Sequence, residues 1–425
     1  MNEAATPNDA CAGLILLARN PTDSVTEGFL PAAARLGLAV TLLTDQPDAH
    51  QEAYERYARV RRGGGTSAGA LPGRPEIVPC DVRDFRAVIA RTAVRKARAG
   101  APAAVFTNSD HLQAQAALAA DYFGLPGKDW RAALRTKNKA ELRRGLAAAG
   151  LDTVGSAELA PDDDPAGHGV PYPCVLKPRE GVAGEDVFLV ADDAELAARC
   201  HEIRTRRPGA ALVLEEYLDG PLHTLETLGD GRVLHPLASF RTDVSPPHFI
   251  EERLRLLPGP PDPCTGQVLA QLRALGVGFG ACHTEYVDQG GRARIVEVNY
   301  RAIGDRCDLA LAEALDLPLF ELILRTHLGE PLPAGLAVRR GTRVRMEYVC
   351  ADRAGTLKAA PGAHVREADG VHLDYRPLRG TGERHPLYRT NRDFLGVLRA
   401  TGRDEGRIDA AVREFLAAHC WEIVP

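Results

Sequence analysis

The chain has 425 residues, which is enough for two or three domains with substantial cores. Its 52 Lys and Arg residues against 57 Asp and Glu residues give a formal net charge of −5, spread along the chain, so neither nucleic acid nor an anionic membrane is indicated as a partner. No apolar run is long enough to span a bilayer, and the N-terminus lacks the pattern of a secretory signal. Nine scattered cysteines without a CxxC pair favour reduced thiols and a cytoplasmic location.

The chain up to about residue 125 has the alternating pattern of an α/β domain. Short apolar runs typical of buried parallel strands occupy 13–18, 38–43 and 103–106. The segment 24–36 has helical spacing, so strand, helix and strand predict a right-handed βαβ unit. No GxGxxG follows the first strand, which argues against a nicotinamide-type dinucleotide site. The Gly- and Pro-rich segment 63–75 is expected to be a loop.

A helix with two lysines at its start is predicted next. Asn138 and Glu141 have the spacing of a capping box, and Gly150 is a glycine that ends the helix. Lys137 and Lys139 lie at the positive end of this helix, where a lysine is unfavourable unless an anion compensates it. We interpret the pair as a candidate anion site, with solvated surface lysines as the alternative.

Lys177 ends the predicted strand 174–177 and leads into the loop 179–184, which we call the glycine loop. Gly181 and Gly184 allow backbone N–H groups to face phosphate oxygens. No GKS or GKT follows, so this is not a P-loop, and a simple hairpin turn is the alternative.

The strand 212–218 leads into a Gly-Pro turn whose backbone groups suit an adenine edge. The alternative is that Glu215 and Glu216 are only solvent-facing strand residues. Residues 241–262 are rich in proline and too polar for a core, so we predict a long connection that is functional or disordered. A helix at 267–275 follows.

The segment from Gly280 to Asp305 contains the best candidate metal ligands. It predicts a β-hairpin with strands at 281–287 and 294–300, joined by a turn at 288–291. Because side chains alternate along a strand, His283 and Glu285 share a face, as do Glu297 and Asn299. Oxygen ligands without Cys or paired His suit Mg²⁺ or Mn²⁺. An ordinary hairpin with a polar outer face is the alternative.

The last part of the chain completes the fold. The run 309–327 has helical spacing, with Asp308 as the expected N-cap. An α+β appendage is predicted after residue 340, with strands at 344–350 and 371–375 and a final helix at 408–419.

The order of these pieces is specific: NKAELRRGLAAAGL, VLKP with a glycine loop, VLEEYLDG, HTEY and EVNYRAIGD. Over about 130–330 this order resembles the ATP-grasp superfamily, and more closely its carboxylate–amine ligase branch, which includes L-amino acid ligases and ligases of peptide and siderophore assembly. The resemblance implies an α/β and α+β protein with the ATP-grasp fold. It implies a Rossmann-like pre-ATP-grasp domain at 1–127 and an ATP-grasp domain at 128–335, with a lid at about 150–218. A C-terminal α+β lobe would follow at 336–425.

The resemblance also implies roles for individual residues. ATP would be bound by Lys139, Lys177, Gly181, Val182, Ala183, Gly184, Glu215, Glu216, Tyr217, Leu218 and His223. His223 departs from the family pattern, because many relatives have a glutamate where this chain has Leu222. Mg²⁺ would be held by Glu285, Glu297 and Asn299, with Arg301 facing the transferred phosphoryl group, and substrates would be contacted by Arg241, Glu251, Gly304 and Asp305.

The implied activity is ATP-dependent amide formation through an acylphosphate, with ADP and phosphate released. Two Mg²⁺ ions, with Mn²⁺ as the alternative metal, would be bridged by Glu297. The substrates would be a small carboxylate and an amine, drawn from amino acids or hydroxycarboxylates in peptide or siderophore biosynthesis. A homodimer is a further hypothesis. The alternatives are a biotin-carboxylase-like enzyme that uses bicarbonate, and a nucleotide-binding protein without catalytic activity.

Overall fold

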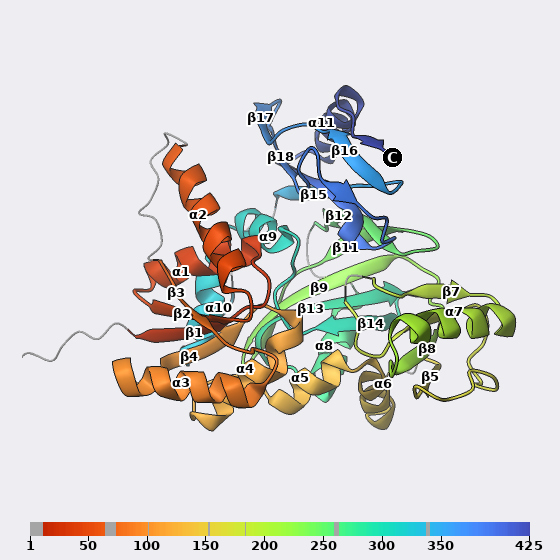
Figure 1. Cartoon of the computed structure of the whole chain (residues 1–425), viewed down its shortest axis with the longest axis horizontal. Coiled ribbons are helices and arrows are strands. Elements are labelled where there is room, and N and C mark those ends of the chain that lie inside the picture. The colour runs from red at the N-terminus through yellow and green to blue at the C-terminus, as the bar shows by residue number, and fades with distance from the viewer. Residues whose placement is uncertain are drawn as a thin grey trace, which may run out of the picture.

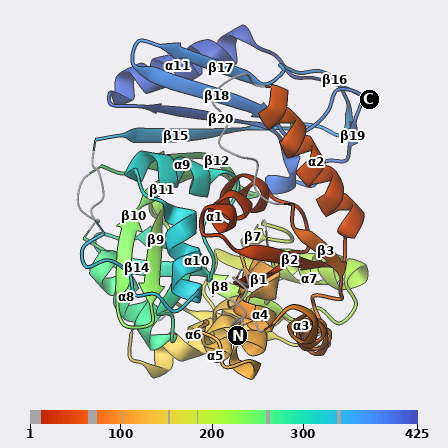
Figure 2. The ribbon, with the colours of Figure 1, turned by 90° about the vertical axis from the view of Figure 1, so that its left-hand side faces the viewer.

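The computed structural model describes residues 12–63, 74–100, 102–151, 154–182, 184–258, 263–336 and 341–425. Within these residues the strands form four sheets with helices around them (Figures 1 and 2). Ala183, most of the predicted loop 63–75 and the end of the predicted connection 241–262 lie outside the described residues. None of the described helices combines the length and the apolar character that crossing a membrane requires.

The N-terminal sheet is parallel, with the order β3-β2-β1-β4, and confirms the predicted βαβ pattern. Its elements are β1 (Gly13–Leu17), η1 (Ser24–Phe29), α1 (Leu30–Arg35), β2 (Ala39–Thr44), α2 (Pro47–Gly63), β3 (Glu76–Pro79), α3 (Phe85–Ala99), β4 (Pro102–Thr107), η2 (Asp110–Leu112) and α4 (Gln113–Tyr122). The single helix expected at 24–36 is a π-helix followed by an α-helix. Pro31, at the start of α1, has no N–H for a helical hydrogen bond to the preceding turn, and the change from π to α geometry falls there while the backbone stays helical.

A small antiparallel sheet of order β5-β8-β6-β7 lies at the opposite end of the molecule (Figure 1). It consists of β5 (Ser156–Leu159), β6 (Cys174–Pro178), β7 (Phe188–Val190) and β8 (Leu212–Glu216), covered by α7 (Asp193–Arg206). Apolar side chains of α7 pack on this sheet and form its core with Leu176 and Leu214. Residues 215–218, at the end of β8, are called the hinge segment below. They and Lys177 line a cavity between this sheet and the large sheet.

A large antiparallel sheet connects these two ends and continues into the C-terminal part. Its strands are β9 (Leu222–Asp230), β10 (Leu234–Ala238), β11 (Phe240–Ser245), β12 (Ile250–Leu256), β13 (Phe279–Asp288), β14 (Ala293–Asn299), β15 (Arg343–Cys350), β17 (His364–Ala368), β18 (Val371–Pro377) and β20 (Phe394–Gly402). Strands β12 and β15 pair across the expected boundary at 335, so the C-terminal part extends the same sheet. The division into three domains stays a prediction.

The remaining elements connect and cover the sheets. They are α5 (Trp130–Lys137), α6 (Lys139–Ala148), α8 (Thr265–Ala274), α9 (Cys307–Leu315), α10 (Leu319–His327), β16 (Gly355–Ala359), β19 (Arg384–His385), η3 (Asn391–Asp393), α11 (Glu405–Ala418) and β21 (Glu422–Val424). Strands β16, β19 and β21 form a separate three-stranded sheet, and α11 packs on β18 and β20.

The expectation of a long irregular connection at 241–262 is wrong, because residues 240–256 form the hairpin β11–β12. The segment is polar because only one face is apolar. Phe240 and Leu254 are buried on that face, whereas Asp243 and Arg253 alternate onto the other. Arg253 also pairs with Glu347 of β15 at 2.6 Å, so ion pairs take the place of apolar packing there.

The single helix expected at 309–327 is also wrong. Helices α9 and α10 are separated by a break that contains Asp316 in the left-handed region (φ 50°) and Pro318. Proline cannot donate the helical hydrogen bond and disfavours helical geometry in the residue before it. Asp308 lies in the first turn of α9 and is not its N-cap, which is Arg306.

Candidate active site

A cavity of about 440 Å³ lies where the small sheet, the large sheet and the loops around them meet. Sixteen predicted site residues line it: Lys139, Lys177, Gly181, Val182, Gly184, Glu215, Glu216, Tyr217, Leu218, Glu251, Glu285, Glu297, Asn299, Arg301, Gly304 and Asp305. Segments far apart in the sequence therefore build one site, and the predicted nucleotide, metal and phosphoryl-contacting positions share it.

The hairpin β13–β14 brings the candidate metal ligands together. His283 stands opposite Asn299 and Glu285 stands opposite Glu297, so all four side chains share the face that lines the cavity. The amide nitrogen of Asn299 lies 3.4 Å from Oε1 of Glu285. Two carboxylates directly opposite each other repel, so this face requires cations.

Lys139 supplies one of these cations. It begins α6, whose N-cap Asn138 accepts hydrogen bonds from the backbone of Ala140 and Glu141. The Lys139 ammonium donates to Oε1 of Glu297 at 2.7 Å. Burial alone would lower the pKa of Lys139, but the Glu297 carboxylate raises it above its ordinary value. In the structure the anion that compensates Lys139 is thus a protein carboxylate.

Glu215, the first residue of the hinge segment, lies in a buried ion cluster. Arg143 donates to both of its carboxylate oxygens, at 2.8 and 2.7 Å, and the Lys177 ammonium lies 2.8 Å from Oε2. Burial alone would raise the pKa of Glu215, but these two cations lower it to about 2. Arg143 also donates to the backbone carbonyl of Ile295 in β14. The Glu215 side chain is therefore not solvent-facing, and it ties the small sheet to α6 and the large sheet.

The far end of the cavity contains carboxylates beside apolar and aromatic side chains. Burial, with Glu285 and Asp305 nearby, raises the pKa of Glu251 to about 8. Tyr348 donates its hydroxyl hydrogen to the backbone carbonyl of Asp305 at 3.1 Å. Asn391 accepts a hydrogen bond from the backbone N–H of Glu251 at 3.1 Å. The C-terminal part of the chain, through Tyr348 and Asn391, thus closes this end.

Two predicted contacts do not line the cavity. The His223 ring stacks against Tyr286, with a centroid separation of 5.7 Å. The Arg241 side chain is 55% exposed and lies 3.8 Å from Asp243, because alternation along β11 turns it to the face opposite Val244, which does line the cavity. The geometry gives no support to the substrate role predicted for Arg241.

No family model matches this chain. The chain is 28% identical over 323 residues to the uncharacterized protein y4rH of Sinorhizobium fredii (strain NBRC 101917 / NGR234). That match covers 71% of this chain and 64% of the relative, so it spans less than two thirds of the relative's length.

Solved structures match almost the whole chain. An L-amino acid ligase from Bacillus licheniformis has a TM-score of 0.76 at 21% identity, covering 98% of this chain and 100% of that one. Phosphoribosylglycinamide synthetase from Anaerococcus prevotii has a TM-score of 0.68 at 12% identity, covering 97% and 100%. The biotin carboxylase domain of Hydrogenobacter thermophilus 2-oxoglutarate carboxylase has a TM-score of 0.68 at 16% identity, covering 97% and 91%. The chain has the ATP-grasp fold.

The ATP-grasp arrangement here includes residues that the sequence did not single out. Asp110 and His111, from the end of the N-terminal sheet, line the cavity, as do Tyr348 and Asn391 from the C-terminal part. Arg143 could have been found from the sequence, because it lies four residues after Lys139 and hence on the same face of α6. The others come from segments that only the tertiary fold brings to the cavity.

The side chains on the hairpin β13–β14 are of the types that bind a metal ion. Among the described residues, no group of three His, Cys, Asp and Glu side chains is placed to hold one. The candidate site instead combines two carboxylates, of Glu285 and Glu297, with the amide oxygen of Asn299. Oxygen donors of this kind suit Mg²⁺, which keeps several waters and binds through few protein ligands.

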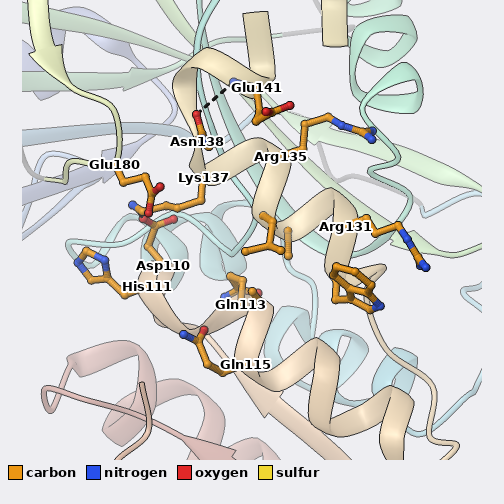
Figure 3. Close-up of a pocket in the computed structure, with 14 residues that line it drawn as sticks. Asp110, His111, Gln113, Gln115, Arg131, Arg135, Lys137, Asn138, Glu141 and Glu180 are labelled. Carbon is orange, nitrogen blue, oxygen red and sulfur yellow. Dashed lines mark hydrogen bonds and ion pairs between the residues drawn. The ribbon is translucent and has the colours of Figure 1, made fainter. Parts of the chain in front are cut away.

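Lys137 is not a solvated surface lysine, which was the alternative that the sequence left open. Its ammonium is paired with Asp110 and donates to the carbonyl of Gly181 at 3.0 Å. Figure 3 shows Lys137, Asp110 and Glu180 pointing toward one another at the edge of a second cavity, of about 460 Å³, between α4 and α5. Burial alone would raise the pKa of Asp110, but Lys137 and Arg301 lower it. Lys137 thus ties the glycine loop of the ATP-grasp fold to the N-terminal sheet.

We expect Lys137→Ala to make the glycine loop more accessible to protease. Losing a charged hydrogen-bond donor costs on the order of 1–3 kcal/mol, which corresponds to local opening about tenfold to a hundredfold more often. Limited proteolysis, with cleavage mapped between residues 180 and 185, measures this effect. Lys358→Ala, which removes an exposed lysine paired with Glu422, is the control. Equal cleavage rates in the two variants would contradict the role assigned to Lys137.

Proposed function

We propose that the protein is an ATP-dependent ligase that joins a carboxylate to an amine through an acylphosphate. The observation that carries this proposal is the convergence of Glu285, Glu297, Asn299 and Arg301 on one cavity with Lys139. A site that only bound ATP would not need every one of these groups. The structural likeness to an L-amino acid ligase supports the same reaction class.

ATP is proposed to lie between the two sheets. The hinge segment 215–218 offers backbone groups to the adenine, and Val175, Leu222, Val287 and Val296 line the same cavity with apolar surface. Lys139 and Lys177 would face the phosphates, with backbone N–H groups of the glycine loop closing over them. His223 lies outside the cavity lining, so the ribose contact is not part of this proposal.

Mg²⁺ is proposed to be held by Glu285, Glu297 and Asn299. Bound there with ATP, it would neutralise charge on the phosphate oxygens. Two ions bridged by Glu297, and Mn²⁺ as the alternative metal, belong to the same proposal. Lys139 already contacts Glu297, so the carboxylate that would bind metal also fixes a phosphate-facing cation.

The chemistry requires two bond exchanges. In the first, a carboxylate oxygen of the substrate forms a bond to the γ-phosphorus of ATP, and the bond between that phosphorus and the β–γ bridging oxygen breaks, releasing ADP. In the second, the amine nitrogen attacks the acyl carbon, the carbon–oxygen bond to phosphate breaks, and the amine loses a proton. Arg301, which lines the same cavity, would stabilise charge on the transferred phosphoryl group. No protein nucleophile is needed.

Glu251 is proposed to receive the ammonium group of a substrate. We expect Glu251→Gln to raise the KM for the amine about tenfold to a hundredfold. Burial raises the pKa of Glu251 to about 8, but a bound ammonium would favour its ionised form, and losing a charged hydrogen-bond partner costs on the order of 1–3 kcal/mol. Arg241→Gln, on the opposite face of the same hairpin, is the matched control. Steady-state kinetics with ATP, carboxylate and amine varied separately will measure both variants. Equal effects of the two substitutions would remove Glu251 from the substrate site.

The function is tested by release of ADP and phosphate from ATP in a matrix of amino acids, polyamines and hydroxycarboxylates, followed by product mass. The proposal requires turnover that depends on both a carboxylate and an amine. Turnover with bicarbonate and no amine would support the carboxylase alternative. ATP binding without turnover under any condition would support a nucleotide-binding protein without catalytic activity. The pathway, the homodimer and the cytoplasmic location remain predictions.

A further inference from the structure

Three neighbouring strands place a row of polar side chains next to the carboxylates that are candidate metal ligands. On β13, His283 stands opposite Glu226 of β9 on one side and Asn299 of β14 on the other. The next row on the same face contains Glu285 and Glu297. His283 and Glu285 line the cavity, whereas Glu226 does not. Glu226 therefore reaches the site only through His283.

His283 bridges two carboxylates. Its Nδ1 lies 2.8 Å from Oε1 of Glu226, and its Nε2 lies 3.4 Å from Oε1 of Glu285. The 2.8 Å separation is a hydrogen bond that holds the ring, and the 3.4 Å separation places Nε2 beside the Glu285 carboxylate. The exposed fractions of His283 and Glu226 are 5% and 3%, so water screens this arrangement little.

A buried histidine–carboxylate pair is a poor way to stabilise a core, because apolar side chains of similar volume often serve stability as well or better. The same geometry does restrain the Glu285 carboxylate, because a ring held on one side by Glu226 keeps its other nitrogen fixed beside Glu285. Outer partners of this kind orient metal-binding carboxylates.

We propose that His283, held by Glu226, is a positioning residue that fixes the Glu285 carboxylate for the metal ion bound with ATP. The proposal rests on the proposed function, since it assigns Glu285 to the metal. Lys139 contacts Glu297, the carboxylate that faces Glu285 across the hairpin. Each of the two facing carboxylates thus has its own neighbouring nitrogen group.

The test uses Mn²⁺ as the probe, with its binding followed by electron paramagnetic resonance in the presence of a non-hydrolysable ATP analogue. We expect Glu226→Gln and His283→Gln each to weaken Mn²⁺ binding about 10- to 100-fold. Binding of ADP in the presence of EDTA, which needs no metal, should stay within about twofold of the wild type for both variants. Because the two residues act in series, the double variant should bind Mn²⁺ no more weakly than the weaker single variant.

His385→Gln is the matched control. His385 forms a buried pair with Asp393 at 2.9 Å but does not line the cavity. It should lose thermal stability as the other histidine variant does while keeping wild-type Mn²⁺ affinity. The double variant replaces both members of the pair with neutral side chains, so it provides a second test if either single variant fails to fold.

The outcomes separate the two proposals. Wild-type Mn²⁺ affinity in folded Glu226→Gln, His283→Gln or the double variant would overturn the positioning role and leave the proposed function standing. A similar loss of affinity in His385→Gln would also overturn it, because the effect would then follow from stability alone. Absence of nucleotide-dependent Mn²⁺ binding in the wild type would overturn the metal site and this inference together.

Discussion

Glu297→Gln is expected to lower kcat about 10²- to 10³-fold while the protein stays folded. The substitution removes a charge that both the proposed metal site and Lys139 use, and losing one such electrostatic contact in an active site typically has an effect of this size. Burial alone would raise the pKa of Glu297, but Lys139 and Lys137 lower it, so the wild-type side chain is a carboxylate at neutral pH. Single-turnover kinetics will measure the change.

Glu414→Gln is the control for this experiment, because Glu414 is an exposed glutamate paired with Arg366 on the C-terminal part of the chain. Circular dichroism should be the same for both variants. A near-normal kcat in purified, folded Glu297→Gln would show that the metal assignment is wrong.

Arg143→Ala is expected to be the most destabilising of the substitutions considered. It removes the donor to both oxygens of Glu215 and leaves that carboxylate buried with Lys177 alone. Breaking a buried ion pair from one side costs about 3–5 kcal/mol. Arg144→Ala, one residue along α6, removes solvent-accessible pairs with Glu141 and with Glu158 of β5 and should cost about 1 kcal/mol or less. Urea midpoints measured for both variants will show the difference.

The same cluster predicts sensitivity to acid. The pKa of Glu215 is lowered to about 2 from an ordinary value of 4.5, so its contribution to stability is complete above pH 4.5 and is lost as the pH falls toward 2. Glu215→Gln should therefore lower stability at pH 7 and flatten this part of the acid-unfolding curve.

Equal urea midpoints for Arg143→Ala and Arg144→Ala would show that the cluster does not hold the small sheet to α6.

Local patterns were enough to predict the features whose partners lie within a few residues. Strand alternation placed Glu285 and Glu297 on one face, and the structure shows them directly opposite each other. Asn138 is the N-cap of α6 as its spacing indicated. The order of the motifs was enough to predict the ATP-grasp fold, which the solved structures confirm. In each case the information lies in side-chain periodicity, capping chemistry or motif order, all of which are present in the linear sequence.

The tertiary structure decided which distant groups meet. The polar segment 240–256 is a hairpin inside the large sheet because β9 and β15 flank it and ion pairs cover one face. Lys137 is partly buried because its ammonium pairs with Asp110 and donates to the glycine loop. Glu226 faces His283 only because β9 lies beside β13. Periodicity determines which face a side chain occupies, but the neighbour on that face depends on strand order, which is set by packing of the whole chain.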